Sequence, residues 1–259
     1  MPLLRVVVHP GAAGPWNMAV DDALLRDPQG GWTLRFYSWE TPTISVGYAQ
    51  PLQRAVDEQL ARRRHIPLVR RPTGGRAVLH ADELTYAIVA PADRGVLAGD
   101  ISASYRRIAA GLHAGLRRLG AAVEVERTGV TPPSAHRGAC FSARTRSELS
   151  VDGRKLVGSA QRRLGGRLLQ HGSLLLGPPQ PRLWAALGEG ADEALRASVG
   201  LEEVLGWRPG ARALIASLTA GIAAELGLTP RRTRLSRHQR LRAAALYRHY
   251  RSAEWTQRA

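Results

Sequence analysis

Lysine is nearly absent from this chain of 259 residues. Of its 37 lysine and arginine residues, Lys155 is the only lysine and the rest are arginine. An amine and a guanidinium differ most where a proton must move, because the pKa of an amine shifts readily whereas arginine stays charged. Cysteine is also reduced to one residue, Cys140. One amine and one thiol are a candidate pair for covalent chemistry. Each also has an ordinary explanation, because codon bias can leave one lysine by chance and a lone cysteine is usually a small buried apolar residue.

Other absences narrow the class of protein. A single cysteine excludes an intramolecular disulfide and a cysteine-based zinc cluster, and no spacing of His, Asp and Glu indicates a metal site. No run of roughly 18 apolar residues occurs, and the first residues lack the pattern of a signal peptide. We therefore expect a globular, cytoplasmic protein that has no membrane partner, no metal and no cofactor.

Acidic residues are few beside the arginines, and the formal net charge is +16. Such a charge attracts acidic macromolecules, which include nucleic acids and acidic proteins. Aromatic residues make up only 5% of the chain, and this argues against a platform on which bases stack. An acidic protein partner is therefore expected rather than a nucleic acid.

The pattern of apolar residues mixes helices and strands without a regular βαβ alternation. Asn17 is expected to cap a helix that continues to Leu25, and from about residue 178 the chain is predicted to be mostly helical. We expect an α+β fold in which helices pack on a largely antiparallel or mixed β-sheet. Strands are predicted at 4–8, 32–39, 43–48, 66–70, 76–80 and 84–90, and further helices at 52–64, 102–119, 183–187, 211–226 and 237–250.

Two hairpins are predicted at Asp152-Gly153 and Gly165-Gly166, which are strong signals for two-residue turns. Their strands cover residues 147–151, 154–162 and 167–176. Because side chains alternate along a strand, Lys155 is expected on a polar face, free to reach a cleft. The predicted polar face holds Glu148, Ser150, Lys155, Ser159 and Gln161, and the opposite face holds Leu149, Val151, Leu156 and Ala160.

The segment from Arg70 to His80 is the densest motif in the chain. Its Pro72 and Gly74-Gly75 predict a loop, in which glycine lets the backbone approach a ligand and expose its N–H groups. Arg71 and Arg76 can hold negative charge beside it, although a tight turn on a basic surface is an equally ordinary explanation. The segment is neither a Walker loop nor a dinucleotide fingerprint. His80 and His171 fit hydrogen-bonded structural histidines better than acid-base groups.

Five segments together resemble the biotin and lipoate protein ligase superfamily, in the order of its lipoate branch. They are residues 17–25, 42–48, 70–80, 153–161 and 170–173. Cys140-Phe141, fifteen residues before Lys155, is similar to the octanoyl-acyl carrier protein:protein N-octanoyltransferases that form a cysteine acyl-enzyme. Residues 250–255 resemble the ending of that family. The chain departs from the family pattern after Phe141, where residues 142–144 replace an acidic residue and Ala-Pro.

The resemblance implies one catalytic domain of the biotin/lipoate ligase fold over residues 1–259, with a helical C-terminal segment from about 178. It implies that Cys140 takes an octanoyl group from octanoyl-acyl carrier protein and passes it to a lysine of a lipoyl domain, such as the glycine cleavage H protein or an E2 subunit of a 2-oxoacid dehydrogenase. Lys155 would lower the pKa of the thiol, and backbone amides at Gly74-Gly75 or Gly158-Ser159 would stabilise the oxyanion. The implied substrate-binding residues are Arg71, Thr73, Gly74, Gly75, Arg76, His80, Gly158, Ser159, Ala160, His171 and Gly172.

Three other functions fit part of the pattern. An ATP-dependent lipoate ligase shares the glycine loop and the lysine, but it activates a free acid as an adenylate. An octanoyl amidotransferase that works between lipoyl domains uses the same thiol chemistry. A basic nucleic-acid-binding protein without catalysis would explain the charge alone, whereas acidic carrier proteins and lipoyl domains explain it as partners of an enzyme.

Overall fold

The computed structural model describes residues 1–126, 148–188 and 190–258. Within these residues an eight-stranded sheet runs through the molecule, and a three-stranded sheet lies beside it. The order of the large sheet is β11-β1-β2-β6-β10-β9-β8-β7. Its strands are β1 (Leu3–Val8), β2 (Trp32–Tyr37), β6 (Glu83–Pro91), β7 (Glu124–Val125), β8 (Leu149–Val151), β9 (Arg154–Leu164), β10 (Arg167–Leu175) and β11 (Thr229–Thr233).

Most neighbours in the large sheet are antiparallel. Strand β1 is the exception, because it pairs in parallel with both β2 and β11. The pairs from β2 through β6, β10, β9 and β8 to β7 are all antiparallel. The prediction of an α+β fold on a largely antiparallel or mixed sheet is therefore confirmed.

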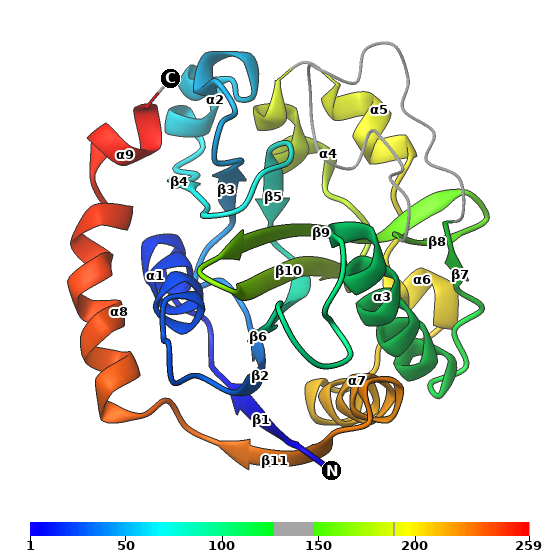
Figure 1. The fold of residues 1–259 in the computed structure, drawn as a ribbon. Coiled ribbons are helices and arrows are strands. Elements are labelled where there is room, and N and C mark those ends of the chain that lie inside the picture. Colours follow the sequence, from blue (N-terminus) through cyan, green and yellow to red (C-terminus); the bar gives the residue numbers. More distant parts are fainter. Residues whose placement is uncertain (127–147, 189, 259) are drawn as a thin grey trace.

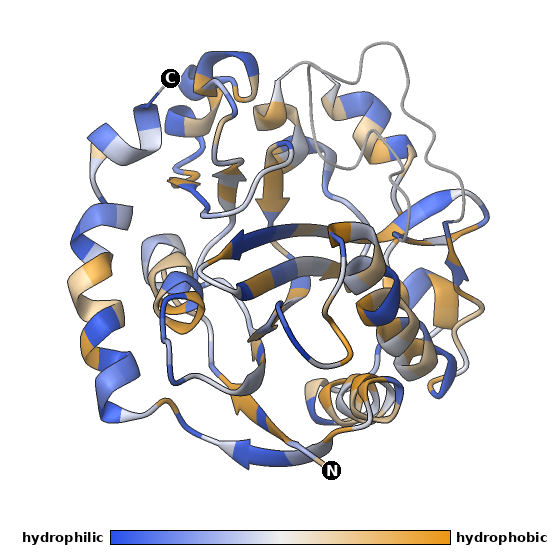
Figure 2. Ribbon diagram, in the orientation of Figure 1, coloured by the Kyte–Doolittle hydropathy of each residue, from blue (hydrophilic) through white to orange (hydrophobic). Residues whose placement is uncertain are grey.

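Helices cover both faces of this sheet (Figure 1). On one face, α3 (Ile101–Arg117) and α7 (Ala211–Leu226) pack together over a core that includes Leu34, Ile88 and Leu168. On the other face, α1 (Gly14–Leu25) packs against α8 (Arg237–Tyr250) over a core that includes Val89 and Leu169. Figure 2 shows the result, with hydrophilic residues along much of α8 and β11 at the outside.

The small sheet has the order β4-β3-β5 and its own apolar cluster. The elements of the small sheet and its surroundings are β3 (Thr43–Val46), β4 (Leu68–Arg70), β5 (Val78–His80), the 3₁₀ turns η1 (Leu52–Arg54) and η3 (Ala185–Leu187), α2 (Glu58–Arg63), α4 (Pro181–Trp184) and α5 (Ala191–Arg196).

The remaining helices are α6 (Leu201–Leu205) and α9 (Ala253–Gln257). Among the described residues, no helix is long and apolar enough to cross a membrane.

Two sequence predictions about helices are wrong. Asn17 lies inside α1, whose N-cap is Ala13, and its side chain donates to the carbonyl oxygens of Ala12 and Ser38. The helix predicted at 52–64 is divided, because Asp57 caps a new helix by accepting a hydrogen bond from the backbone N–H of Leu60. The described residues after about 178 are mostly helical, as predicted, and they also contain strand β11, which was not predicted and which adds to the sheet beside β1.

Both predicted hairpins are confirmed. Asp152 and Gly153 have φ of 49° and 72°, and Gly165 and Gly166 have φ of 54° and 72°. Two consecutive positive φ angles are the signature of a type I′ turn, whose twist matches that of the flanking strands. These turns fix the order β8-β9-β10 and bring two of the sequence motifs onto neighbouring strands.

Candidate active site

A cavity is lined by residues of both sheets and of α1. Met18, Tyr37, Trp39 and Val78 supply apolar surface. Of the residues expected to bind substrate, Arg71, Gly75, His80, Gly158, Ser159, Ala160, His171 and Gly172 line this cavity, whereas Thr73, Gly74 and Arg76 do not.

The floor of the cavity is formed where β9 and β10 pair. The register places Gly158 opposite Ser173, Ser159 opposite Gly172, and Ala160 opposite His171. A Cβ atom on Gly172 would lie 2.6 Å from the Gly158 carbonyl oxygen and 2.6 Å from the Ser159 hydroxyl. Two motifs that are separate in the sequence therefore meet in a floor where only glycine fits at position 172.

The glycine loop forms another wall and is held by Arg71. Gly75 has φ of +87°, a left-handed conformation that favours glycine. The Arg71 guanidinium donates to the carbonyl oxygens of Ser45 at 3.1 Å and of Gly74 and Arg76 at 2.7 Å each. These contacts fasten the loop to β3, and the role of Arg71 in holding a negatively charged ligand stays a prediction.

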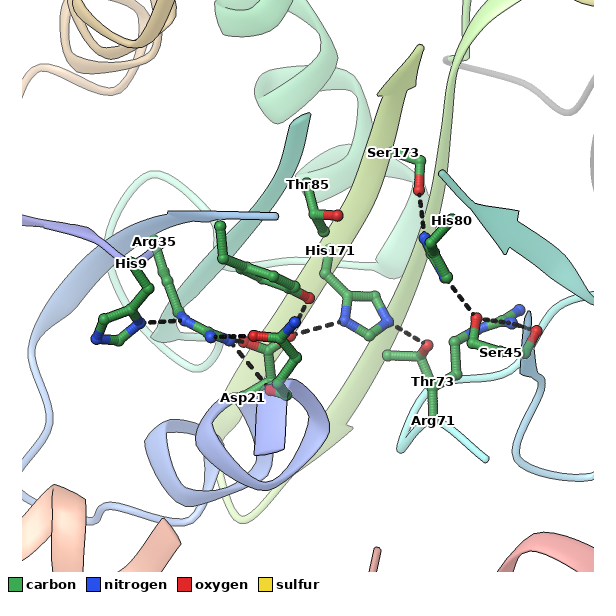
Figure 3. Close-up of polar contacts among 12 residues, drawn as sticks. His9, Asp21, Arg35, Ser45, Arg71, Thr73, His80, Thr85, His171 and Ser173 are labelled. Carbon is green, nitrogen blue, oxygen red and sulfur yellow. Dashed lines mark hydrogen bonds and ion pairs between the residues drawn. The ribbon is translucent and has the colours of Figure 1, made fainter. Parts of the chain in front are cut away.

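Behind the loop lies a buried carboxylate, Asp21 of α1 (Figure 3). Arg35 Nη1 donates to Asp21 at 2.6 Å and the Tyr37 hydroxyl donates at 2.8 Å, while the side chains of Arg35 and Asp21 are 0% exposed. Burial raises the pKa of Asp21, but Arg35 and then His171 outweigh it, and the pKa stays below its usual value. Asp21 is therefore an ionised acceptor.

Asp21 orients His171, which in turn holds Thr73. The Nδ1 atom of His171 lies 3.0 Å from Asp21 Oδ2, and its Nε2 atom lies 2.6 Å from the Thr73 hydroxyl. Burial lowers the pKa of His171 despite the opposing effect of Asp21. The ring is therefore neutral, donates from Nδ1 to Asp21 and accepts at Nε2 from Thr73. This chain of contacts joins α1, β10 and the glycine loop.

A second chain of the same kind joins Glu83, His80 and Ser45. His80 Nδ1 lies 3.0 Å from Glu83 Oε1, and His80 Nε2 lies 2.7 Å from the Ser45 hydroxyl. The imidazole stacks on Trp39 with a centroid distance of 3.9 Å and an interplanar angle of 13°. Both histidines thus use both ring nitrogens in connections between elements.

Lys155 is 1% exposed, and its Nζ atom lies 2.6 Å from Glu148 Oε1. Strand β9 is irregular here, because Lys155 pairs with Ser150 while Val157 pairs with Leu149. One extra residue, Leu156, therefore stands on β9 and forms a β-bulge, a feature that re-aims side chains. Leu149 and Ser150 are consecutive residues of β8, so their side chains point to opposite faces of the sheet. Val157 pairs with Leu149 and lies in the core under α3, so Lys155, which pairs with Ser150, is directed to the other face, on which the cavity lies.

This bulge overturns part of the predicted face assignment. Glu148 and Lys155 do share a side, but Leu156 belongs to the core beneath α3 whereas Ala160 lines the cavity. Gln161 accepts a hydrogen bond from Ser104 of α3, so it lies on the opposite face from Ala160. The expectation that Lys155 is free to reach an open cleft is also wrong, because its ammonium group is buried in an ion pair.

The other predicted catalytic residue, Cys140, lies outside the described residues. Sequence reasoning missed several residues of the site, among them the buried charged residues Arg35 and Glu83 and the indole of Trp39. The position of Asp21 was an available signal, because it falls four residues after Asn17 on the apolar face of the α1 sequence. A carboxylate that is buried on such a face needs a positively charged or hydrogen-bonding partner in the core. Among the residues that the structure describes, no group of three or more His, Cys, Asp or Glu side chains is placed to hold a metal ion.

Comparison with known proteins identifies the fold and the family. Residues 14–211 match the model of the lipoyl protein ligase A/B catalytic domain. The octanoyltransferase LipM of Moorella thermoacetica is 46% identical over 211 residues, which cover 76% of this chain and 77% of that protein. The octanoyltransferase LipM of Kyrpidia tusciae is 37% identical over 270 residues, which cover 97% of this chain and 98% of that protein.

Solved structures agree with this assignment at the level of the fold. The bi-partite lipoate protein ligase of Thermoplasma acidophilum, studied with its E2 lipoyl domain, superimposes with a TM-score of 0.83 at 21% identity. The superposition covers 99% of this chain and 97% of that one. With the family model spanning most of the sequence and LipM relatives aligned along nearly its whole length, the chain belongs to the lipoyl protein ligase A/B catalytic domain family.

Proposed function

We propose that this acyltransferase carries an octanoyl group from octanoyl-acyl carrier protein to a lysine of a lipoyl domain, through a thioester on Cys140. The family and the octanoyltransferase relatives support octanoyl transfer in lipoate biosynthesis. The acyl carrier donor, the lipoyl acceptor and the thioester are our inference from the residues of this chain. We also propose that residues 1–259 act as one catalytic domain.

The cavity is the observation that carries the proposal. Apolar side chains and small residues line much of it, and the histidines in its wall are tied to buried carboxylates. A site of this kind suits an acyl chain, which needs apolar contact and few polar groups. Eight of the eleven residues expected to bind substrate lie around it. Gly158, Ser159 and Ala160 also belong to the strand that carries Lys155.

The first half of the reaction is a thiol exchange. The Cys140 thiolate attacks the carbonyl carbon of the octanoyl thioester, and a new carbon–sulfur bond forms while negative charge moves to the carbonyl oxygen. Collapse of this intermediate breaks the bond to the sulfur of the carrier, which leaves as a thiolate and takes up a proton from the Lys155 ammonium group. Backbone N–H groups at Gly74-Gly75 or Gly158-Ser159 are the proposed donors to the oxyanion.

The second half forms the amide. The neutral amine of the acceptor lysine attacks the Cys140 thioester, its proton passes to Lys155, which the first half has left as a neutral amine, and the sulfur departs as thiolate. A side chain that can both favour a thiolate and take up a proton serves both halves. Lys155 meets this requirement, and the ion pair with Glu148 at 2.6 Å fixes its Nζ atom. Arginine at this position would remain charged in the second half.

Mass spectrometry of the intact protein tests the thioester. After incubation with octanoyl-acyl carrier protein and no acceptor, we expect one octanoyl adduct on the wild type and none on Cys140→Ser. Addition of a lipoyl domain should remove the adduct and give an acylated lysine on that domain. Full transfer activity of Cys140→Ser would contradict the proposed mechanism.

Lys155→Arg separates the two halves of the reaction. We expect this variant to form the octanoyl adduct but to release it slowly to the lipoyl domain, by a factor of about 100 or more, as for loss of a general acid-base group. Single-turnover measurement of the adduct gives both rates. The control is Arg154→Lys, which places an amine at an adjacent partly exposed position and should change neither rate.

The alternative functions differ in their donors. An ATP-dependent ligase would acylate a lipoyl domain only when ATP and free lipoate or octanoate are supplied. An amidotransferase would use an octanoylated lipoyl domain in preference to the carrier protein. Three parallel assays with these donors and one acceptor therefore distinguish the proposed activity from both.

A further inference from the structure

One wall of the cavity carries four hydrogen-bond donors, and all four converge on one buried oxygen behind the wall. Trp39 Nε1 lies 3.1 Å from Glu83 Oε1, and the Ser173 hydroxyl and His80 Nδ1 lie 3.0 Å from it. The Thr85 hydroxyl donates to the same oxygen. Trp39, His80, Thr85 and Ser173 all line the cavity, whereas Glu83 does not.

Glu83 therefore controls the polarity of a surface that it does not touch. Its own side chain is fully buried, and the donors of four lining residues lie within hydrogen-bond distance of its Oε1 atom. A donor that faced an alkyl chain instead would lose its hydrogen bond to water and gain nothing in return. Because these donors are already engaged, the four residues can offer an alkyl chain apolar contact from their rings, methyl and methylene groups.

We propose that Glu83 is a specificity-determining residue, which makes this wall receptive to an unsubstituted acyl chain and unfavourable to a chain that carries a hydroxyl group. The inference rests on the proposed function in one respect, namely that the ligand of the cavity is a thioester-linked acyl chain. A hydroxyl on that chain loses its water on entry and meets a wall whose donors are already engaged. Purely apolar pockets reject an added hydroxyl by about 100-fold.

The test compares octanoyl, 3-hydroxyoctanoyl and 8-hydroxyoctanoyl thioesters of the carrier protein as donors. For each protein variant, kcat/KM for the octanoyl donor is divided by kcat/KM for each hydroxylated donor. The hydroxylated chain that gives the larger ratio in the wild type is the one whose hydroxyl group meets the wall. Trp39 Nε1 keeps the Thr85 hydroxyl at 2.9 Å as an acceptor, and the Ser173 hydroxyl lies 3.1 Å from His80 Nδ1. Glu83→Leu therefore releases chiefly the Thr85 hydroxyl, which loses its acceptor and can then pair with the hydroxyl of the ligand. We expect the larger ratio to fall by about tenfold, the worth of one hydrogen bond.

Two control variants separate this role from a general effect on packing. Glu83→Gln keeps an acceptor oxygen at the same place and should keep the ratio of the wild type. The double variant Thr85→Val, Ser173→Ala removes two donors instead of releasing them, so it should also keep the ratio. Both controls alter the same buried cluster, and a nonspecific loss of packing would change their ratios as well.

The proposal is overturned if folded Glu83→Leu, checked by circular dichroism, discriminates as the wild type does against both probes. It is also overturned if the double variant loses discrimination by about tenfold. Should Glu83→Leu not fold, Glu83→Met, which likewise lacks an acceptor oxygen, takes its place, and discrimination equal to that of the wild type would again overturn the proposal. Failure of the proposed function would show differently, as the absence of an octanoyl adduct on the wild type.

Discussion

The two glycines of the loop offer a test in which neighbouring positions give opposite results. Gly75 has φ of +87°, and a Cβ atom there would lie 2.9 Å from Arg71 Nη2. Gly74 is not in the left-handed region, and a Cβ atom there would meet no other atom within 4 Å. We therefore expect Gly75→Ala to destabilise the protein and Gly74→Ala to leave its stability nearly unchanged.

The magnitude follows from two costs at Gly75. An L-residue in the left-handed conformation costs about 1–2 kcal/mol. Displacement of Arg71 Nη2 also disturbs its hydrogen bonds to the carbonyl oxygens of Gly74 and Arg76, each worth about 1 kcal/mol. A loss of about 2–4 kcal/mol lowers the Tm of a protein of this size by roughly 4–16 °C. For Gly74→Ala the expected change is within about 0.5 kcal/mol.

Thermal unfolding of the two variants, followed by circular dichroism, measures this difference. Octanoyl transfer should fall in Gly75→Ala at temperatures where it is still folded, because the loop that lines the cavity changes its path. Equal Tm values for the two variants would refute the reasoning, and so would a Gly75→Ala protein as stable as the wild type.

Three further predictions concern pH, the C-terminal helix and salt. Stability should decrease as the pH falls below about 6.5. Burial and Arg35 lower the pKa of His9 to about 4, and burial lowers that of His171, so the unfolded chain binds protons that the native state excludes. The depressed pKa of Asp21 adds a further loss of stability at still lower pH, where this carboxylate becomes protonated. Between pH 8 and 4, the Tm of His9→Gln should decrease less than that of the wild type. Trp255→Phe should lower the Tm by about 2–4 °C, because the indole N–H of Trp255 donates to the Arg70 carbonyl oxygen at 2.9 Å. The control is Trp207→Phe, which should leave the Tm unchanged because the ring of Trp207 is half exposed. Added salt should lower kcat/KM for the carrier-protein donor and leave kcat unchanged, because the net charge of +16 speeds the association of the two proteins and salt screens that attraction. An equal fall in kcat would contradict this.

Local signals in the sequence were sufficient for many elements. Helices at 211–226 and 237–250 have the bounds that the apolar pattern predicted, because each buries one side along its whole length. The Asp152-Gly153 and Gly165-Gly166 turns were equally readable, since few residues accept positive φ. These turns placed Gly158-Ser159-Ala160 beside His171-Gly172 correctly, and most of the cavity floor follows from them.

Features that depend on distant partners were not readable. The bulge at Leu156 arises from the pairing of β9 with β8, and no residue type in the strand announces it. Arg35 stands in a strand between apolar residues and reads as a solvated position, yet it is buried against Asp21. Glu83 likewise gains its role from Trp39, 44 residues earlier, and Ser173, 90 residues later. Charge and spacing alone do not reveal such pairings.

The burial of Lys155 has a consequence for the protein as a target of its own chemistry. In the proposed mechanism, a thioester on the enzyme would be presented to every amine on the enzyme's own surface. Here the only lysine is 1% exposed and paired with a carboxylate, and all other basic side chains of the Lys and Arg class are guanidinium groups, which are poor nucleophiles. The basic surface that attracts acidic partners thus offers no lysine for self-acylation.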